Sequence, residues 1–163
     1  MTDARADNVE QRRSPRLPPR WFIRTAWMVH RAIYRFTGHR RGLWLPGTNK
    51  WGTFILKTIG RRSGKKRSVI LGYYEDGPNL VTMAMNGWGK AEPAWWLNLQ
   101  AQPDVTVETK TGSRLMRGRA AVGEERARLW ARWSEHQAHP GDLEGYSSRR
   151  PSETAVVVLE PRD

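Results

Sequence analysis

The chain alternates short runs of β-branched and aliphatic residues with turns rich in glycine, proline and asparagine, a pattern typical of a protein built mainly from strands. These runs predict strands at residues 53–59, 68–75, 80–85, 105–110, 115–122 and 154–159. Helices are expected over 94–99, where Pro93 opens the first turn, and over 124–136. Strands outnumber possible crossover helices, so the pattern favours a mainly β (α+β) fold, a mostly antiparallel barrel with helices packed on its outside.

Two further segments precede the strands. Residues 1–17 are polar, basic and contain proline, which predicts a disordered tail before a single domain over 18–163. Residues 18–38 carry aromatic and aliphatic side chains at helical spacing, with arginines opposite them. Such an amphipathic helix packs on the domain with a solvated basic face, lies on an anionic membrane surface, or does both as a movable lid.

The composition narrows the choice of partners. Lys and Arg number 28 against 16 for Asp and Glu, a net charge of +12, which favours a polyanionic partner: phosphate, nucleic acid or an anionic membrane. No secretory signal and no apolar run long enough to span a bilayer are visible, so we expect a cytoplasmic protein, peripheral at the inner face of the membrane if the basic helix binds there.

Side-chain catalysis finds little support in the sequence. The chain has no cysteine, which excludes disulfides, thiolate metal sites and a cysteine nucleophile. His136 and His139 are spaced as a metal pair could be, but a solvated helix end explains them better, and no metal is expected. Nothing resembles a nucleophile elbow. An enzyme of this kind would depend on a cofactor for its chemistry.

The most informative segment is the turn at residues 60–67, GRRSGKKR, which joins the first two predicted strands. Glycines let backbone N–H groups approach a ligand, and arginine grips a phosphate through two parallel hydrogen bonds. The turn therefore suggests a loop that recognises an anion such as a phosphorylated cofactor. A solvated basic hairpin, or a patch attracted to nucleic acid or acidic lipid, explains the same residues.

Four segments together resemble the deazaflavin-dependent nitroreductase family. They are residues 56–67 (LKTIGRRSGKKR), 93–103 (PAWWLNLQAQP), 124–130 (EERARLW) and 156–161 (VVVLEP), in the family's order. The resemblance implies a split β-barrel of the flavin-mononucleotide-binding type. It also implies that the reduced deazaflavin coenzyme F420 binds in preference to flavin mononucleotide, and that a hydride passes to a quinone-like or nitroaromatic acceptor. The phosphate and polyglutamate tail of that coenzyme are anionic and would suit a basic protein.

The resemblance also assigns candidate site residues. Residues of the first strand and the basic turn would hold the phosphate and tail: Lys57, Gly60, Arg61, Arg62, Ser63, Gly64 and Arg67. The backbone of the next strand would line the ring, and later segments would lie beside ring and phosphate: Val69, Ile70, Leu71, Met85, Asn86, Gly87, Trp95 and Asn98. Trp95 could equally be an ordinary core aromatic. The acceptor would lie near Trp27, Leu143 and Tyr146, with Tyr146 as a candidate catalytic proton donor.

Two positions depart from the family pattern. Asn86 stands where better-known members have lysine, although Lys90 is close enough in sequence to supply the cation. Leu143 stands where they have an aromatic residue. Because of these departures, a second hypothesis stays open: a non-catalytic member of the same fold that binds fatty acid or lipid. A nucleic-acid-binding module has only charge and aromatic residues in its favour, so no nucleic-acid partner is expected.

Overall fold

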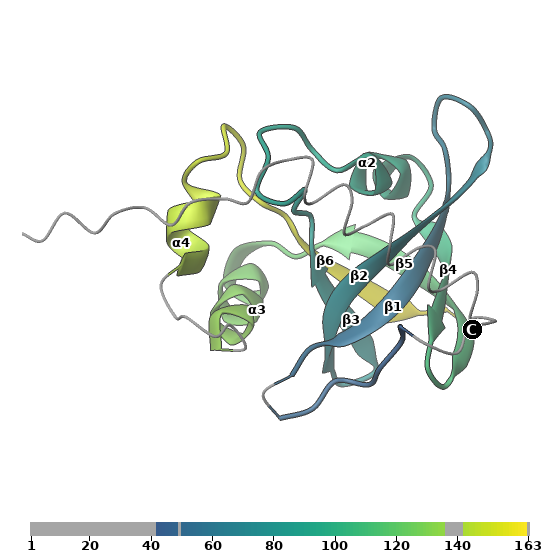
Figure 1. Ribbon diagram of the computed structural model, residues 1–163, viewed down its shortest axis with the longest axis horizontal. Helices are drawn as coiled ribbons and strands as arrows, with labels where there is room; N and C mark the ends of the chain where they lie inside the picture. Colours follow the sequence, from purple (N-terminus) through teal and green to yellow (C-terminus); the bar gives the residue numbers. More distant parts are fainter. Residues whose placement is uncertain (1–41, 49, 136–141, 163) are drawn as a thin grey trace, which may run out of the picture.

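Six strands close into one barrel, and the described part of the chain places three helices around it (Figure 1). The computed structural model describes residues 42–48, 50–135 and 142–162. The elements run in the order β1 (Gly52–Ile59), β2 (Lys66–Asp76), β3 (Asn79–Met83), α2 (Ala94–Ala101), β4 (Asp104–Thr109), β5 (Gly112–Ala120), α3 (Gly123–Glu135), α4 (Asp142–Ser147) and β6 (Val156–Pro161). The predicted tail, the helix over 18–38 and the histidine pair lie outside the described residues.

Every strand pairing in the barrel is antiparallel, in the order β1-β2-β3-β6-β5-β4, and β1 closes the circle on β4. The predicted antiparallel barrel and the mainly β class are therefore confirmed. Closure pairs the edge strands and so removes the exposed edges that would invite aggregation. The longest pairing joins β1 and β2, where Gly52 faces Tyr73 and Ile59 faces Lys66, so the basic turn projects from the end of this hairpin.

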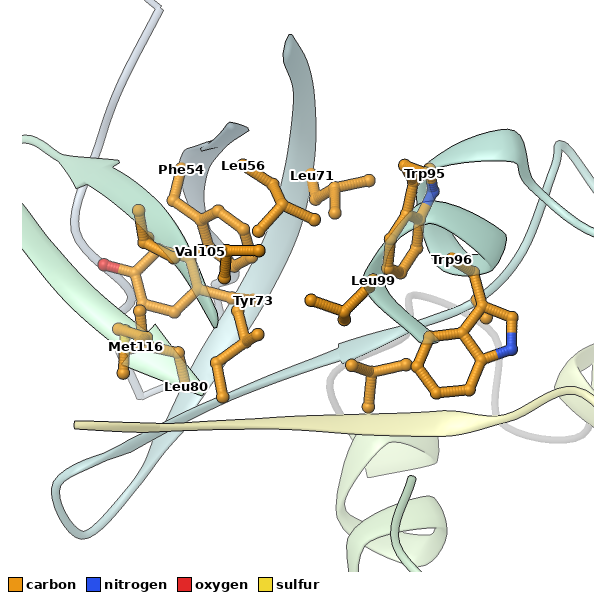
Figure 2. Packing of buried hydrophobic residues seen from close by; sticks show 14 residues of the cluster. Phe54, Leu56, Leu71, Tyr73, Leu80, Trp95, Trp96, Leu99, Val105 and Met116 are labelled. Carbon is orange, nitrogen blue, oxygen red and sulfur yellow. The ribbon is translucent and has the colours of Figure 1, made fainter. Parts of the chain in front are cut away.

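The barrel interior is filled by alternate residues of the strands, because successive side chains point to opposite faces. Phe54 and Leu56 of β1 face inward with Leu71 and Tyr73 of β2, and all four are buried. Helix α2 covers one end of this interior. Figure 2 shows Trp95, Trp96 and Leu99 of α2 packed against the strand residues of the same cluster. The contact is close at Gly118 of β5, where an added Cβ would lie 2.6 Å from a Leu99 methyl carbon.

A second cluster lies between the outer face of the sheet and helices α3 and α4, which sit side by side in Figure 1. The Tyr74 hydroxyl donates to the Leu129 carbonyl at 2.8 Å, and the Trp130 indole donates to Glu144 at 2.5 Å, which links α3 to α4. The sequence did not predict α4. Among the described helices, none is both long enough and apolar enough to cross a bilayer.

Candidate functional site

A cavity of ≈ 660 Å³ opens at the end of the barrel that α2 covers. Four segments form its walls: the basic turn between β1 and β2, the first half of β2, the loop from β3 to α2, and the first turn of α2. Its lining residues are Thr58, Gly60, Arg61, Arg62, Ser63, Arg67, Ser68, Val69, Leu71, Met85, Asn86, Gly87, Pro93, Ala94, Trp95 and Asn98.

The basic turn is held in a compact shape by its own backbone. The amides of Ser63 and Gly64 both donate to the Gly60 carbonyl, at 3.1 and 2.8 Å, and the Gly60 amide donates to the Lys65 carbonyl at 2.8 Å. Gly64 has a φ of 63°, a left-handed conformation that glycine adopts without strain. At Gly60 an added Cβ would lie 2.7 Å from the Ser63 hydroxyl oxygen, so the turn folds closely over this glycine.

Asn98 fixes this turn to helix α2. Its side-chain oxygen accepts from the Arg61 amide at 3.1 Å and from Arg61 Nη1 at 3.4 Å, and its amide nitrogen donates to the Thr58 hydroxyl at 3.4 Å. Asn98 is only 5 % exposed, so these bonds satisfy polar atoms that water does not reach. One buried amide therefore orients the first arginine of the turn at the edge of the cavity.

The five cations of the turn have no acidic partner among the described residues. None of Arg61, Arg62, Lys65, Lys66 and Arg67 is in an ion pair with another described residue, and all five are exposed. Ion pairs do engage the arginines at positions 117, 119, 126, 128, 132, 150 and 162. The turn thus presents unneutralised positive charge, with a planar donor fork on each arginine, to an anion at the cavity mouth.

The opposite part of the cavity is apolar. Val69 and Leu71 of β2, Met85 of the β3–α2 loop and Trp95 of α2 line it. Trp95 is 9 % exposed, lines the cavity and also belongs to the barrel core. A cavity lined by both arginines and apolar side chains suits a ligand that combines an apolar ring with an anionic substituent.

The β3–α2 loop forms a wall through a tight turn. The Gly89 amide donates to the Asn86 carbonyl at 2.9 Å, and the two residues between them, Gly87 and Trp88, have φ values of 54° and 59°. Two successive positive φ angles are the signature of a type I′ turn. Trp88 is the one non-glycine residue with positive φ among those described. Asn86 and Gly87 line the cavity, whereas Lys90 is exposed and outside its lining.

Three residues predicted at the cofactor site lie outside this lining. Lys57 is on the outer face of β1, where its ammonium pairs with Glu108 at 2.7 Å. It lines a second hollow of ≈ 540 Å³ together with Lys66 and Arg67. Gly64 is at the tip of the turn. Ile70 points away from the barrel interior and packs with Leu43 and Ile55.

The residues predicted to contact the acceptor are not gathered in the cavity. Leu143 is 1 % exposed and packs in the cluster under α3 and α4. The Tyr146 ring stacks on Trp88, with centroids 5.7 Å apart and an interplanar angle of 15°, so it lies behind the β3–α2 loop, outside the lining. The Arg149 guanidinium lies 5.6 Å from the centre of the same ring. Trp27 lies outside the described residues.

Four lining residues were missed by the sequence prediction: Thr58, Ser68, Pro93 and Ala94. Each is next to, or two residues from, a predicted site residue, so strand alternation and the start of a helix could have indicated them. Among the described residues, no three histidine or acidic side chains are grouped as a metal ion would require. The cavity's donors are instead guanidinium, hydroxyl and amide groups, which suit an anion.

The sequence matches a known family over most of its length. The model of the family described as "F420H(2)-dependent quinone reductase" matches residues 27–161. The chain is similar to an F420H(2)-dependent quinone reductase of Mycobacterium tuberculosis, with 33% identity over 136 residues that cover 82% of this chain and 89% of the relative.

Solved structures agree with the barrel. The chain is similar to an F420-H2 dependent reductase, FDR-A, with a TM-score of 0.58 and 27% identity, over 73% of this chain and 100% of that one. It also resembles the heme storage protein HutZ of Vibrio cholerae, with a TM-score of 0.50 and 12% identity over 82% and 89% of the two chains, a likeness of fold alone.

Proposed function

Because this chain belongs to the F420H(2)-dependent quinone reductase family, it is an F420-dependent reductase, and we propose that its acceptor is a quinone-like compound. The observation that carries the proposal is the unpaired basic turn at the mouth of an apolar cavity. We assign the phosphate and acidic tail of coenzyme F420 to this turn and its ring to the apolar part of the cavity.

The residues present fit that coenzyme. Arg61, Arg62 and Arg67 supply guanidinium donors at the cavity mouth, and Ser63 supplies a hydroxyl beside them. A side chain at position 60 would collide with the Ser63 hydroxyl, because an added Cβ would lie 2.7 Å from its oxygen, so Gly60 lets that hydroxyl keep its place beside the arginines. Asn86 is uncharged where the resemblance to the family places lysine, and the cations that line the cavity are Arg61, Arg62 and Arg67. Flavin mononucleotide also carries a phosphate and remains the control ligand.

The coenzyme, when bound in its reduced form, supplies a hydride, which together with one proton converts a quinone to its hydroquinone. The chain's own residues then bind and orient the two reactants. Val69, Leu71 and Trp95 exclude water from the ring side of the cavity, and the basic turn fixes the anionic end. Holding both reactants in one geometry replaces a slow encounter in solution by a reaction within one complex.

We assign Tyr146 to the acceptor side, where its hydroxyl would donate the proton or orient the acceptor. This assignment is supported by the position of Tyr146 on α4, where its ring stacks on Trp88. Trp88 is the neighbour in sequence of Gly87, which lines the cavity. If the hydroxyl donates the proton, Tyr146→Phe lowers kcat with the quinone and leaves the affinity for F420 unchanged, because the ring and its stacking remain. An unchanged kcat would assign the proton to solvent.

Anaerobic mixing of the protein with reduced F420 and menadione tests the acceptor. We expect the oxidised coenzyme to appear faster than in a protein-free mixture, with a nitroaromatic compound run in parallel to compare acceptor classes. No acceleration by menadione would contradict the quinone assignment. Tight co-purification of a fatty acid, together with no measurable affinity for F420, would favour the alternative of a non-catalytic lipid binder.

The proposal includes peripheral attachment to an anionic membrane, where lipid-soluble quinones dissolve. It is supported by the basic amphipathic pattern of residues 18–38 and by the net charge of +12. Trp44 and Leu45, which follow that segment, are each 47% exposed. The protein should sediment with vesicles that contain anionic lipid and stay in solution with neutral ones. Equal behaviour with both would remove this part of the proposal.

A further inference from the structure

We propose that Arg150 is a positioning residue for the cofactor cavity, because its buried guanidinium holds both ends of the loop 84–92 that forms one cavity wall. The inference rests on the proposed function in one respect, since the wall faces F420 only if the coenzyme binds there. Arg150 itself does not line the cavity. It acts through Met85, Asn86 and Gly87, which do.

The first end of the loop is bound at Ala84, directly after β3. Arg150 Nη1 donates to the Ala84 carbonyl at 2.8 Å and to the Thr154 hydroxyl at 2.8 Å. The Ala84 amide donates to the Ala155 carbonyl at 2.9 Å. Both backbone polar groups of Ala84 are therefore occupied, and the next residue in the chain, Met85, already lines the cavity.

The second end is bound at Glu92, directly before helix α2. Arg150 Nη2 lies 2.9 Å from Glu92 Oε1, and the Ser152 hydroxyl donates to the same oxygen at 2.7 Å. Pro93 and Ala94, which follow, line the cavity. One planar group thus joins the point where the loop leaves β3 to the point where it enters α2.

Between these ends the loop is held in a conformation that costs free energy. Trp88 has a φ of 59°, which an L residue with a bulky side chain rarely adopts. Its stacking on Tyr146 holds the outer side of the loop. A strained turn persists only when its surroundings fix it, and Arg150 fixes it from the inside.

Stability alone does not account for the buried charge. The Arg150 side chain is 0% exposed, and its Nε and Nη2 have no well-directed hydrogen bond to any described residue, nor does Glu92 Oε2. The Nη2–Glu92 distance is short, so the pair attracts as charges although the angle is poor for a hydrogen bond. An apolar side chain of similar volume would avoid this desolvation. What the guanidinium adds is the fixed distance between two backbone segments.

The test compares Arg150→Lys with Arg126→Lys as a matched control. Lysine keeps the charge but lacks the fork that reaches both loop ends. Arg126 Nη2 donates to the Thr154 carbonyl and pairs with Glu153, so it contacts the same 150–154 segment without touching the loop. Two quantities are measured: hydrogen exchange of the amides of residues 85–91 in the coenzyme-free protein, and the Kd for F420 from fluorescence titration.

For Arg150→Lys we expect faster exchange at both ends of the loop and a Kd about ten-fold higher or more, as displaced supporting residues typically cause. Arg126→Lys should leave loop exchange and Kd unchanged. A second variant, Glu92→Gln, should speed exchange only next to α2, because the bond to Ala84 remains. If Arg150→Lys does not fold, the hydrogen exchange of Glu92→Gln decides whether the contact between Arg150 and Glu92 holds the loop.

The inference is overturned if Arg150→Lys has the hydrogen exchange of the loop and the Kd of the wild type. It is also overturned if the hydrogen exchange of the loop in Glu92→Gln matches the wild type. If the wild-type protein does not bind F420, the proposed function fails. The exchange measurements on the coenzyme-free protein still decide whether Arg150 holds the loop.

Discussion

At the residue scale, Asn98 shows how one side chain can serve the fold and the site together. It lies on the buried face of α2, and both of its polar side-chain atoms bond to the hairpin that carries the basic turn. Asn98→Ala removes an acceptor from the Arg61 amide and a donor to the Thr58 hydroxyl. We expect the free energy of unfolding to fall by about 1–2 kcal/mol, as for lost buried hydrogen bonds, and the Kd for F420 to rise by roughly ten-fold.

Thermal unfolding and fluorescence titration measure these two effects. Gln100→Ala is the matched control, because Gln100 is an exposed amide on the same helix. It should change neither quantity beyond a few tenths of a kcal/mol. A Kd in Asn98→Ala equal to that of the wild type would mean that the Arg61 backbone is oriented by the turn alone.

The sequence could place most of the cavity-lining residues, because motif and strand alternation point to the same positions. Five residues of the turn line the cavity together with Val69 and Leu71: Gly60, Arg61, Arg62, Ser63 and Arg67. Alternation also explains why two predicted residues do not. Lys57 and Ile70 each lie one position from an inward-facing residue, so their side chains point to the outside of the barrel. A sequence motif matches every position of a segment, so it does not separate residues that face into the barrel from those that face out.

At the scale of elements, the packing of α2 on β5 depends on the absence of a side chain at Gly118. An added Cβ would lie within 2.8 Å of three Leu99 side-chain carbons. Gly118→Ala should therefore push α2 outward and lower the free energy of unfolding by about 1–3 kcal/mol, as overpacking does. Chemical denaturation measures the change.

A double-mutant cycle makes this prediction sharper. Leu99→Ala alone should cost about 2–5 kcal/mol, and the double variant should lose less than the sum of the two, since alanine at position 99 leaves room for the new Cβ. Gly145→Ala in α4, where an added Cβ meets no atom within 4 Å, should be neutral or slightly stabilising. If the losses of unfolding free energy in Gly118→Ala and Leu99→Ala add up in the double variant, the proposed clash between the new Cβ and Leu99 is contradicted.

The β2–β3 hairpin is joined to α3 by Asp76, and this contact makes stability depend on pH. Hydrogen bonds from Arg128, with the nearby Arg132, hold the pKa of Asp76 below its usual range. Because the pKa of Asp76 is lower in the folded state, its ionised carboxylate adds to the free energy of unfolding. This contribution is fully present above the unfolded-state pKa of about 4 and is lost as the pH falls through the lower folded-state pKa.

We therefore expect Asp76→Asn to lower Tm at neutral pH and the difference from wild type to shrink below about pH 4, where the unfolded aspartate also binds its proton. Melting curves from neutral to acidic pH measure this. Asp104→Asn, at a more exposed aspartate paired with Arg117 and Arg162, should lower Tm less. If the Tm difference between Asp76→Asn and the wild type does not change with pH, the ionised carboxylate of Asp76 is not the stabilising form.

The elements themselves were predictable in kind, but α4 was not. Most strands were found because they carry β-branched residues or alternate in polarity between turn signals, and their observed bounds differ by only a few residues from the predicted ones. Helix α4 spans Asp142–Ser147 and contains Gly145, so neither its length nor its helix propensity distinguishes it from a loop. Its contacts stabilise it instead: Leu143 is buried among α3 residues, and Glu144 accepts from the Trp130 indole.

At the scale of the whole molecule, the question is whether the net charge of +12 or its local arrangement attracts the coenzyme. A general positive field raises the encounter rate of any anion, and salt screens it. The basic turn differs from other unpaired cations of the described surface because Arg61, Arg62 and Arg67 line the cavity. Charge removed there should matter more than the same charge removed elsewhere.

Two double variants with equal net charge separate these explanations. Arg61→Ala with Arg67→Ala should raise the Kd for F420 roughly 10–100-fold at low salt, as for lost charge-assisted hydrogen bonds, and should flatten the rise of Kd with salt. Lys110→Ala with Arg114→Ala removes two exposed cations outside the lining of the cavity. Because these contribute only to the long-range field, Kd should change less than about three-fold and keep its salt dependence. Similar losses in both pairs would assign the affinity to the net charge of the molecule and leave the turn without a specific role.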